Sequence, residues 1–191
     1  EVVRQSPMEG SYGIGHTRWA THGRPTEENA HPHRDCTGQI VVVHNGIVEN
    51  YVELKHQLEK EGHKFVTETD TEIIAHLVEK YMREGGPLED AVRKTVKLLT
   101  GVYSLAILSS ADPNKIIAAR TGPPSVIGLG QGEFFVASDI PAILAHTRDM
   151  FFLADGDIAV LTPQGVRVMD VDGNTIERAV QHISWDPIMA E

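Results

Sequence analysis

The sequence is poor in cysteine, in long apolar runs and in positive charge, and each shortage excludes a class of protein. Cys36 is the one cysteine among 191 residues, so no disulfide can form within the chain, and we expect a reducing compartment such as the cytoplasm. No apolar run approaches the ~20 residues that a transmembrane helix needs, so no membrane association is expected. The formal net charge of −10 argues against nucleic acid or an anionic membrane surface as the partner.

The first residues also lack the marks of a natural start. The stretch EVVRQSPMEG has no initiator methionine and none of the basic, apolar and small-residue regions of a signal peptide. We therefore expect the chain to be a fragment. With 41% hydrophobic and 23% charged residues, it can still form one domain with a sizeable core.

Helical signals dominate the middle of the chain and strand signals its second half. Three helices are expected: one capped by Asn50 and stopped by Gly62, one behind the capping cluster 69–72 and ended by 85–86, and one opened by Pro87. A short helix is expected at 141–146. Strands are expected at 12–16, 40–43, 64–67, 103–108, 115–119, 125–129, 134–137, 151–153, 158–161 and 166–169. This distribution indicates an α+β layered domain.

One dipeptide allows two interpretations. Asn45-Gly46 follows the apolar run 40–43, and Asn-Gly between apolar runs is a strong signal for a tight hairpin turn. An asparagine amide beside a glycine N–H can equally present two donors to one oxyanion. Local sequence alone favours the turn.

The stretch 13–33 is the densest in residues that can carry chemistry. Arg18 beside Trp19 suits a carboxylate in a dry pocket, although a surface arginine stacked on a half-buried tryptophan explains the pair equally well. A metal site built from His22, His31, His33 and His44 is disfavoured by the spacing of these histidines. The alternative is that they hydrogen-bond the long loop into place.

Asp70 and Cys36 are two further candidates for a functional role. Asp70 stands at a predicted helix start, where capping is the ordinary role, but a carboxylate there can also bind a substrate ammonium group. Cys36 lies in a polar turn, and no neighbour in the sequence supplies the base that a nucleophilic thiol needs. We therefore expect no catalytic role for Cys36.

Three segments together resemble a known family. These are His-Thr-Arg-Trp-Ala-Thr-His-Gly at 16–23, His-Asn-Gly-Ile-Val-Glu-Asn at 44–50 and Glu-Thr-Asp-Thr-Glu at 68–72. In this order and spacing they resemble the glutaminase domains of glucosamine-6-phosphate synthases, which are class II glutamine amidotransferases. The resemblance covers nearly the whole chain. It implies an N-terminal-nucleophile (Ntn) hydrolase αββα sandwich over 1–182, with 183–191 as the start of a linker toward a sugar-isomerase domain.

The resemblance also implies roles for single residues. Asn45 and Gly46 would stabilise the oxyanion, and Asp70 would take the α-ammonium of glutamine. Arg18 would pair with the α-carboxylate. Trp19, Thr21 and His22 would belong to the loop that closes over the substrate. No cofactor or metal is implied.

The chain departs from this family at its first residue. The family's nucleophile is an N-terminal cysteine, whereas residue 1 is glutamate. We therefore expect a domain lacking its first strands, which cannot hydrolyse glutamine alone. In the full-length protein, the resemblance implies a homodimer whose second domain accepts ammonia onto fructose 6-phosphate, giving glucosamine 6-phosphate. The open alternatives are a non-catalytic module that binds glutamine or glutamate, a histidine-based metallohydrolase, and another amidotransferase.

Overall fold

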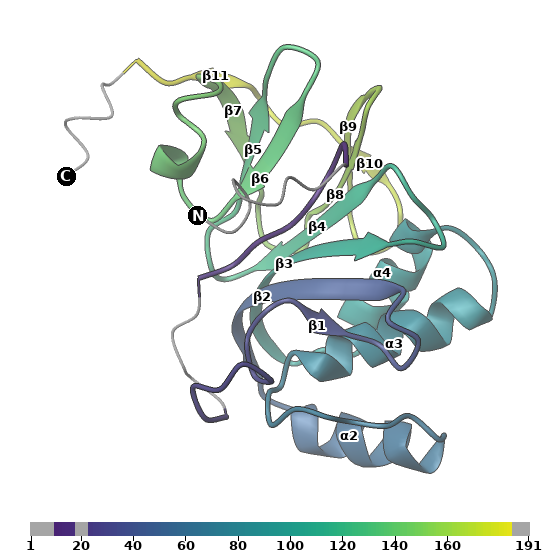
Figure 1. Cartoon of the computed structure of the whole chain (residues 1–191). Coiled ribbons are helices and arrows are strands. Elements are labelled where there is room, and N and C mark those ends of the chain that lie inside the picture. Colours follow the sequence, from purple (N-terminus) through teal and green to yellow (C-terminus); the bar gives the residue numbers. More distant parts are fainter. Residues whose placement is uncertain (1–9, 18–22, 185–191) are drawn as a thin grey trace.

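The computed structural model describes residues 10–17 and 23–184, arranged as helices on one sheet that is stacked on a second sheet (Figure 1). The larger sheet has the order β1-β2-β3-β4-β8-β9-β10, and the smaller has the order β11-β7-β5-β6. Every pairing in both sheets is antiparallel. The predicted α+β class is confirmed.

The strand bounds are as follows. The larger sheet contains β1 (His33–Arg34), β2 (Ile40–Val48), β3 (Gly101–Ser109), β4 (Ile116–Thr121), β8 (Ile158–Thr162), β9 (Gly165–Met169) and β10 (Thr175–Ile176). The smaller sheet contains β5 (Val126–Leu129), β6 (Phe134–Ala137), β7 (Asp149–Phe152) and β11 (Gln181–His182). The expected strands from 103 to 169 are all present within a few residues. Those expected at 12–16 and 64–67 are wrong, because neither segment pairs in a ladder.

The three main helices lie where the apolar periodicity predicts them. They are α2 (Tyr51–Lys60), α3 (Glu72–Arg83) and α4 (Leu88–Val96), and they cover one face of the larger sheet. The helix expected at 141–146 is shorter, with η1 (Ile140–Ala142) followed by turns. In the described residues no helix is long and apolar enough to cross a bilayer.

Three apolar clusters separate the layers. The largest lies between the helices and the larger sheet and includes Ile73, Ile74, Val92 and Ile107, all fully buried. The second lies between the sheets, where Ala118 and Ala159 of one face Ile127 and Phe151 of the other. A third packs the smaller sheet against the η1 segment. The layers are therefore helix, sheet, sheet and a thin helical cover, which corresponds to a reduced form of the expected αββα sandwich.

Candidate active site

Strand β2 is the central element of the site. One of its faces packs against the helices, and the other lines a cavity. Val42 and Val48 belong to the core on the helix side, and His44 Nδ1 lies 3.0 Å from Thr71 Oγ1 at the start of α3. Successive side chains of a strand point to opposite faces. Val43 and Asn45 accordingly point the other way and line a cavity.

This cavity has a volume of about 480 Å³ and lies where the two sheets meet the segment 13–17. Its walls are the segment 13–17, residues 43–45 of β2, residues 104–106 of β3 and residues 134–138 around β6, together with Ile116, Ser125 and Ala142. Polar groups from β2 and β3 meet apolar groups from β6, as expected of a small-molecule site.

Asn45 is oriented inside this cavity by a histidine that sequence reasoning did not single out. His16 Nε2 lies 2.6 Å from Asn45 Oδ1, and the Asn45 residue is half-buried. Because the imidazole N–H donates to the amide oxygen, the Asn45 NH₂ group is directed away from His16 and can donate to a ligand.

The expected hairpin turn at Asn45-Gly46 is wrong. Asn45-Gly46 lies inside the nine-residue strand β2, which stays in register with β3 from Ile40↔Ser109 to Val48↔Gly101. Gly46 has φ +133°, and a Cβ added there would lie 2.1 Å from the carbonyl oxygen of Val102. The glycine is needed because β3 approaches closely, and not because the chain reverses.

The hydrogen bonds of β2 show where the Gly46 N–H points. The N–H groups of Ile40 and Val48 donate to the side chains of Asp35 and Asp70, at 2.9 and 2.8 Å, and so point away from β3. N–H directions alternate along an antiparallel strand, so the Gly46 N–H points to the same outer edge. Among the described strands, only β1 pairs along that edge, and only with residues 41–42. The Gly46 N–H is thus directed to an edge that no described strand covers.

Asp70 lies beside the same strand but does not cap α3. The helix has Thr71 as its N-cap residue without a side-chain cap bond, whereas Asp70 Oδ2 accepts from the Val48 N–H. The Asp70 residue is buried, at 3% exposure. The Val48–Asp70 hydrogen bond and the His44–Thr71 contact both join β2 to the start of α3. They lie on either side of Gly46 along the strand.

The loop before β1 is anchored by a pair that the sequence analysis missed. Asn29 is buried; its Oδ1 accepts from the Glu68 N–H at 2.9 Å, and its Nδ2 donates to the carbonyl oxygen of Arg24. Glu68 in turn accepts from the Arg24 N–H. Four predicted site residues, Arg18, Trp19, Thr21 and His22, lie outside the described residues, so this anchor fixes the segment that follows them.

The segment that leads into α3 is held by an ionised carboxylate. Glu72 accepts from the Val66 and Thr67 N–H groups and from the Thr67 hydroxyl, at 2.7–2.8 Å. Burial alone would raise the pKa of the Glu72 carboxyl, but hydrogen bonds from His76, Thr67 and Val66 lower it to about 2. Glu72 therefore stays charged and orders the backbone that precedes Asp70.

The rings of the loop histidines contact one another, and His16 links them to Asn45. The rings of His16 and His31 lie 4.2 Å apart, those of His31 and His33 lie 4.7 Å apart, and His33 Nε2 lies 3.2 Å from Thr69 Oγ1. In the part of the chain that the structure describes, these histidines and His44 do not bring ligand atoms to one point. The contacts support the interpretation that they order the loop.

Comparisons with known proteins agree on one family. A family profile described as "Glutamine amidotransferase domain" matches residues 16–145. The chain is 53% identical over 184 residues to the glutamine–fructose-6-phosphate aminotransferase (isomerizing) of Methanothermobacter thermautotrophicus, covering 96% of this chain and 31% of that protein. It is 54% identical over 179 residues to the enzyme of the same name from Aquifex aeolicus, covering 94% and 30%. The chain thus spans about a third of the length of these relatives.

Solved structures show the same fold. The glutamine phosphoribosylpyrophosphate amidotransferase of B. subtilis, solved with ADP and GMP, superposes with a TM-score of 0.68 at 28% identity, over 84% of this chain and 35% of that one. A glutamine aminotransferase class-II domain protein from Silicibacter pomeroyi superposes with a TM-score of 0.52 at 18% identity, over 75% and 70%, which bears on the fold alone.

Proposed function

The chain belongs to the glutamine amidotransferase domain family, and from this premise we propose that the cavity beside β2 binds glutamine and stabilises the transition state of its hydrolysis. The observation that carries the proposal is the geometry at Asn45-Gly46. The Asn45 amide is oriented into the cavity by His16, and the next residue directs its N–H to a part of the β2 edge that no described strand covers.

Two neighbouring donors of this kind can stabilise a tetrahedral oxyanion. Negative charge develops on the amide oxygen of glutamine when the carbonyl carbon is attacked, and fixed donors stabilise that charge without reorganising. The rigidity comes from the β2–β3 ladder, because the Gly46 backbone is confined by Val102. The attacking thiolate that the resemblance implies has no counterpart in this sequence, whose one cysteine does not line the cavity.

The remaining groups would bind the amino-acid end of the substrate. We assign the α-ammonium to Asp70, whose buried carboxylate is held beside β2 by the Val48 N–H. We assign the α-carboxylate to Arg18, with Trp19, Thr21 and His22 closing over it. Closure of such a loop would exclude water and fix the pose of the substrate.

For the whole protein we propose a glutamine–fructose-6-phosphate aminotransferase, supported by the relatives that are 53% and 54% identical. Residues 1–182 would form the glutaminase domain, and 183–191 would start the linker to a sugar-isomerase domain that accepts ammonia onto fructose 6-phosphate. We further propose that the whole protein is a homodimer, as the resemblance implies. We place it in the cytoplasm, because a single cysteine fits a reducing compartment.

The proposal is tested by separating binding from chemistry. Calorimetry should show that the chain binds L-glutamate and that Asp70→Asn weakens binding about tenfold or more, because an ion pair to the ammonium is lost. The matched control, Asp172→Asn, changes an exposed aspartate and should bind as the wild type does.

Ammonia release from L-glutamine is measured with this chain and with any longer natural form that contains it. Asn45→Ala should lower the rate constant on the order of a hundredfold or more while glutamate binding changes only a few-fold. Binding without release in every form would favour the non-catalytic binding module. Absence of both would overturn the proposal.

A further inference from the structure

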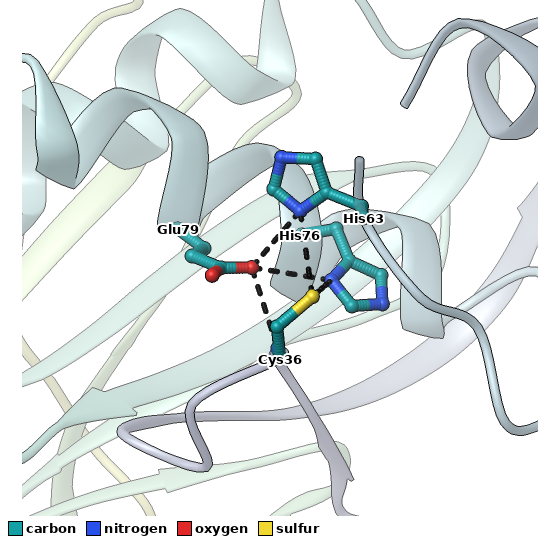
Figure 2. Close-up of side chains that lie close together, drawn as sticks. All are labelled: Cys36, His63, His76 and Glu79. Atoms are coloured by element: carbon teal, nitrogen blue, oxygen red, sulfur yellow. Dashed lines mark hydrogen bonds and ion pairs between the residues drawn. The ribbon is translucent and has the colours of Figure 1, made fainter. Parts of the chain in front are cut away.

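A second cluster of side chains, none of which lines the cavity, lies where the turn between β1 and β2 meets α3 (Figure 2). It contains Cys36 from the turn between β1 and β2, His63 from the segment after α2, and His76 and Glu79 from α3. One ligand atom from each of these residues lies within 4.8 Å of the other three. We propose that this cluster, the Cys36 cluster, binds a divalent transition-metal ion, with Zn²⁺ as the first choice.

Four of the six distances between the ligand atoms lie within about 0.4 Å of the edges of a zinc-centred tetrahedron. Cys36 Sγ lies 3.7 Å from His63 Nδ1 and 3.5 Å from His76 Nδ1, and Glu79 Oε2 lies 3.0 and 3.3 Å from the same two nitrogens. With Zn–S near 2.3 Å and Zn–N and Zn–O near 2.0–2.2 Å, tetrahedral geometry gives edges of about 3.3–3.6 Å. A thiolate, two imidazoles and a carboxylate therefore converge on one point at the right scale.

Hydrogen bonding within the cluster does not satisfy these atoms well. Glu79 Oε2 lies 3.3 Å from the Cys36 nitrogen and 3.0 and 3.3 Å from the Nδ1 atoms of His63 and His76. When the neutral His76 ring carries its proton on Nε2, which faces Glu72, its Nδ1 has a lone pair and cannot donate to Glu79. A cation at the centre uses the lone pairs of all four atoms instead.

The surroundings resemble those of known metal sites. His76 Nε2 lies 3.4 Å from Glu72 Oε1, so the ring would bind metal through one nitrogen and a carboxylate through the other. The Lys64 N–H points at Cys36 Sγ at 3.4 Å, and Arg83 pairs with the second oxygen of Glu79. The charges of Zn²⁺, a thiolate and a carboxylate sum to zero, which suits a site where three of the four residues are buried.

A catalytic thiol explains the Cys36 cluster less well. Partial desolvation of the sulfur and the neighbouring Glu79 carboxylate raise the pKa of the Cys36 thiol, whereas an activated nucleophile has a lowered pKa. The proposed ion would be structural. It would join the β1–β2 turn, the end of α2 and the middle of α3, the helix whose first turn follows Asp70. This inference is independent of the glutamine proposal, and either can fail without the other.

The first experiment measures metal binding by the purified chain. After treatment with a chelator and exchange into metal-free buffer, titration against a chromophoric zinc indicator should give one Zn²⁺ per chain, and Co²⁺ should give a tetrahedral spectrum with a thiolate charge-transfer band. Cys36→Ser and His63→Asn should each weaken Zn²⁺ binding on the order of a hundredfold or more, because even outer partners of ligands contribute 10–100-fold. His56→Asn changes an exposed histidine on α2 and is the matched control.

The second experiment uses the fact that the chain has one cysteine. Alkylation by iodoacetamide, followed by mass spectrometry, reports on Cys36 alone and should slow about tenfold or more when Zn²⁺ is added. Circular dichroism checks that each variant folds; Cys36 is exposed, so Cys36→Ser should retain the fold. Absence of stoichiometric Zn²⁺, an unchanged alkylation rate, or equal losses in His56→Asn and His63→Asn would overturn the proposal.

Discussion

At the scale of single residues, the site depends on a glycine that no other amino acid can replace. Gly46 combines a positive φ with a close approach of β3, since a Cβ would lie 2.1 Å from the Val102 carbonyl oxygen. The same constraint acts at Gly101 on β3, where a Cβ would lie 2.2 Å from the Ile47 carbonyl oxygen. These two glycines let β2 and β3 approach closely beside the cavity.

Gly46→Ala should therefore destabilise the fold by about 2–4 kcal/mol, from backbone strain together with a clash that neither strand can relieve cheaply. Urea unfolding followed by circular dichroism measures this loss. Gly132→Ala is the control, because Gly132 also has a positive φ but nothing lies within 4 Å of an added Cβ. It should cost only about 1 kcal/mol. Equal losses for the two variants would show that the clash with β3 contributes nothing.

At the scale of elements, the starts of α2 and α4 are held by long-range partners and not by capping bonds from the side chains of their own N-cap residues. Asn50 stands at the N-cap of α2, yet its side chain bonds the Leu98 carbonyl oxygen and the Thr100 N–H at 2.8 and 3.0 Å. The prediction that the Asn50 side chain caps this helix is therefore wrong, although Asn50 does occupy the N-cap position. At α4, Asp112 from the turn between β3 and β4 accepts from the Leu88 N–H and pairs with Lys115. The starts of α2 and α4 are thus each fixed by one polar side chain to the segments that precede and follow β3.

Asp112→Ala should destabilise the protein by about 1 kcal/mol at neutral pH, as for loss of a helix cap. Burial alone would raise the pKa of the Asp112 carboxyl, but the Leu88 N–H and Lys115 outweigh burial and lower it. A lowered folded-state pKa stabilises the fold above the unfolded value, near 3.9, and this contribution is lost as pH falls through the folded value.

The measurement compares urea unfolding of the wild type and Asp112→Ala from neutral to acidic pH. Their difference should be constant above about pH 5 and shrink below about pH 4. Asp172→Ala is the control, since that side chain is 69% exposed and pairs with Lys97 on the surface. Its effect should stay within about 0.5 kcal/mol. A pH-independent difference for Asp112→Ala would contradict the assignment.

At the scale of the whole molecule, the two sheets are joined by one apolar cluster and by the chain itself, which passes between them from β4 to β5, from β7 to β8 and from β10 to β11. The chain leaves the larger sheet at β10 and enters the smaller one at β11, and Arg178 lies in this connection. Its guanidinium binds both oxygens of Asp157 at 2.7 and 2.6 Å, and the Asp157 residue is 1% exposed. Asp157 also accepts a hydrogen bond from the Ala154 N–H. Asp157 therefore connects the β10–β11 segment, through Arg178, to the turn between β7 and β8.

Arg178→Met should destabilise the fold by about 2–3 kcal/mol, because it leaves a buried carboxylate without its cation. Thermal unfolding by calorimetry measures the loss. Arg167→Met is the control: the Arg167 side chain is 54% exposed and makes a single contact of 3.2 Å to Glu89. It should change stability by less than about 1 kcal/mol. A loss for Arg178→Met as small as that of the control would mean that the β10–β11 segment contributes little to joining the sheets.

The sequence by itself determined the elements and the family. The apolar spacing of Ile73, Ile74, Leu77 and Val78 located α3, and the β-branched runs after residue 101 located the strands, because periodicity is a local property of the chain. The family followed from three short segments, and the matching profile confirmed it. The sequence also identified Asn45, Gly46 and Asp70 as candidates, and the structure places all three on or beside one strand.

Only the tertiary structure decided what these residues contact. Asn45-Gly46 has the local signature of a turn, but pairing with β3 keeps it in a strand, since ladder bonds across nine residues outweigh a local preference. Asp70 has the signature of a cap, yet its partner is Val48, 22 residues away. Cys36 has no base nearby in the sequence, and folding brings His63 and His76 to it from 27 and 40 residues away. Contacts over such separations depend on how the layers stack, which no short stretch of sequence encodes.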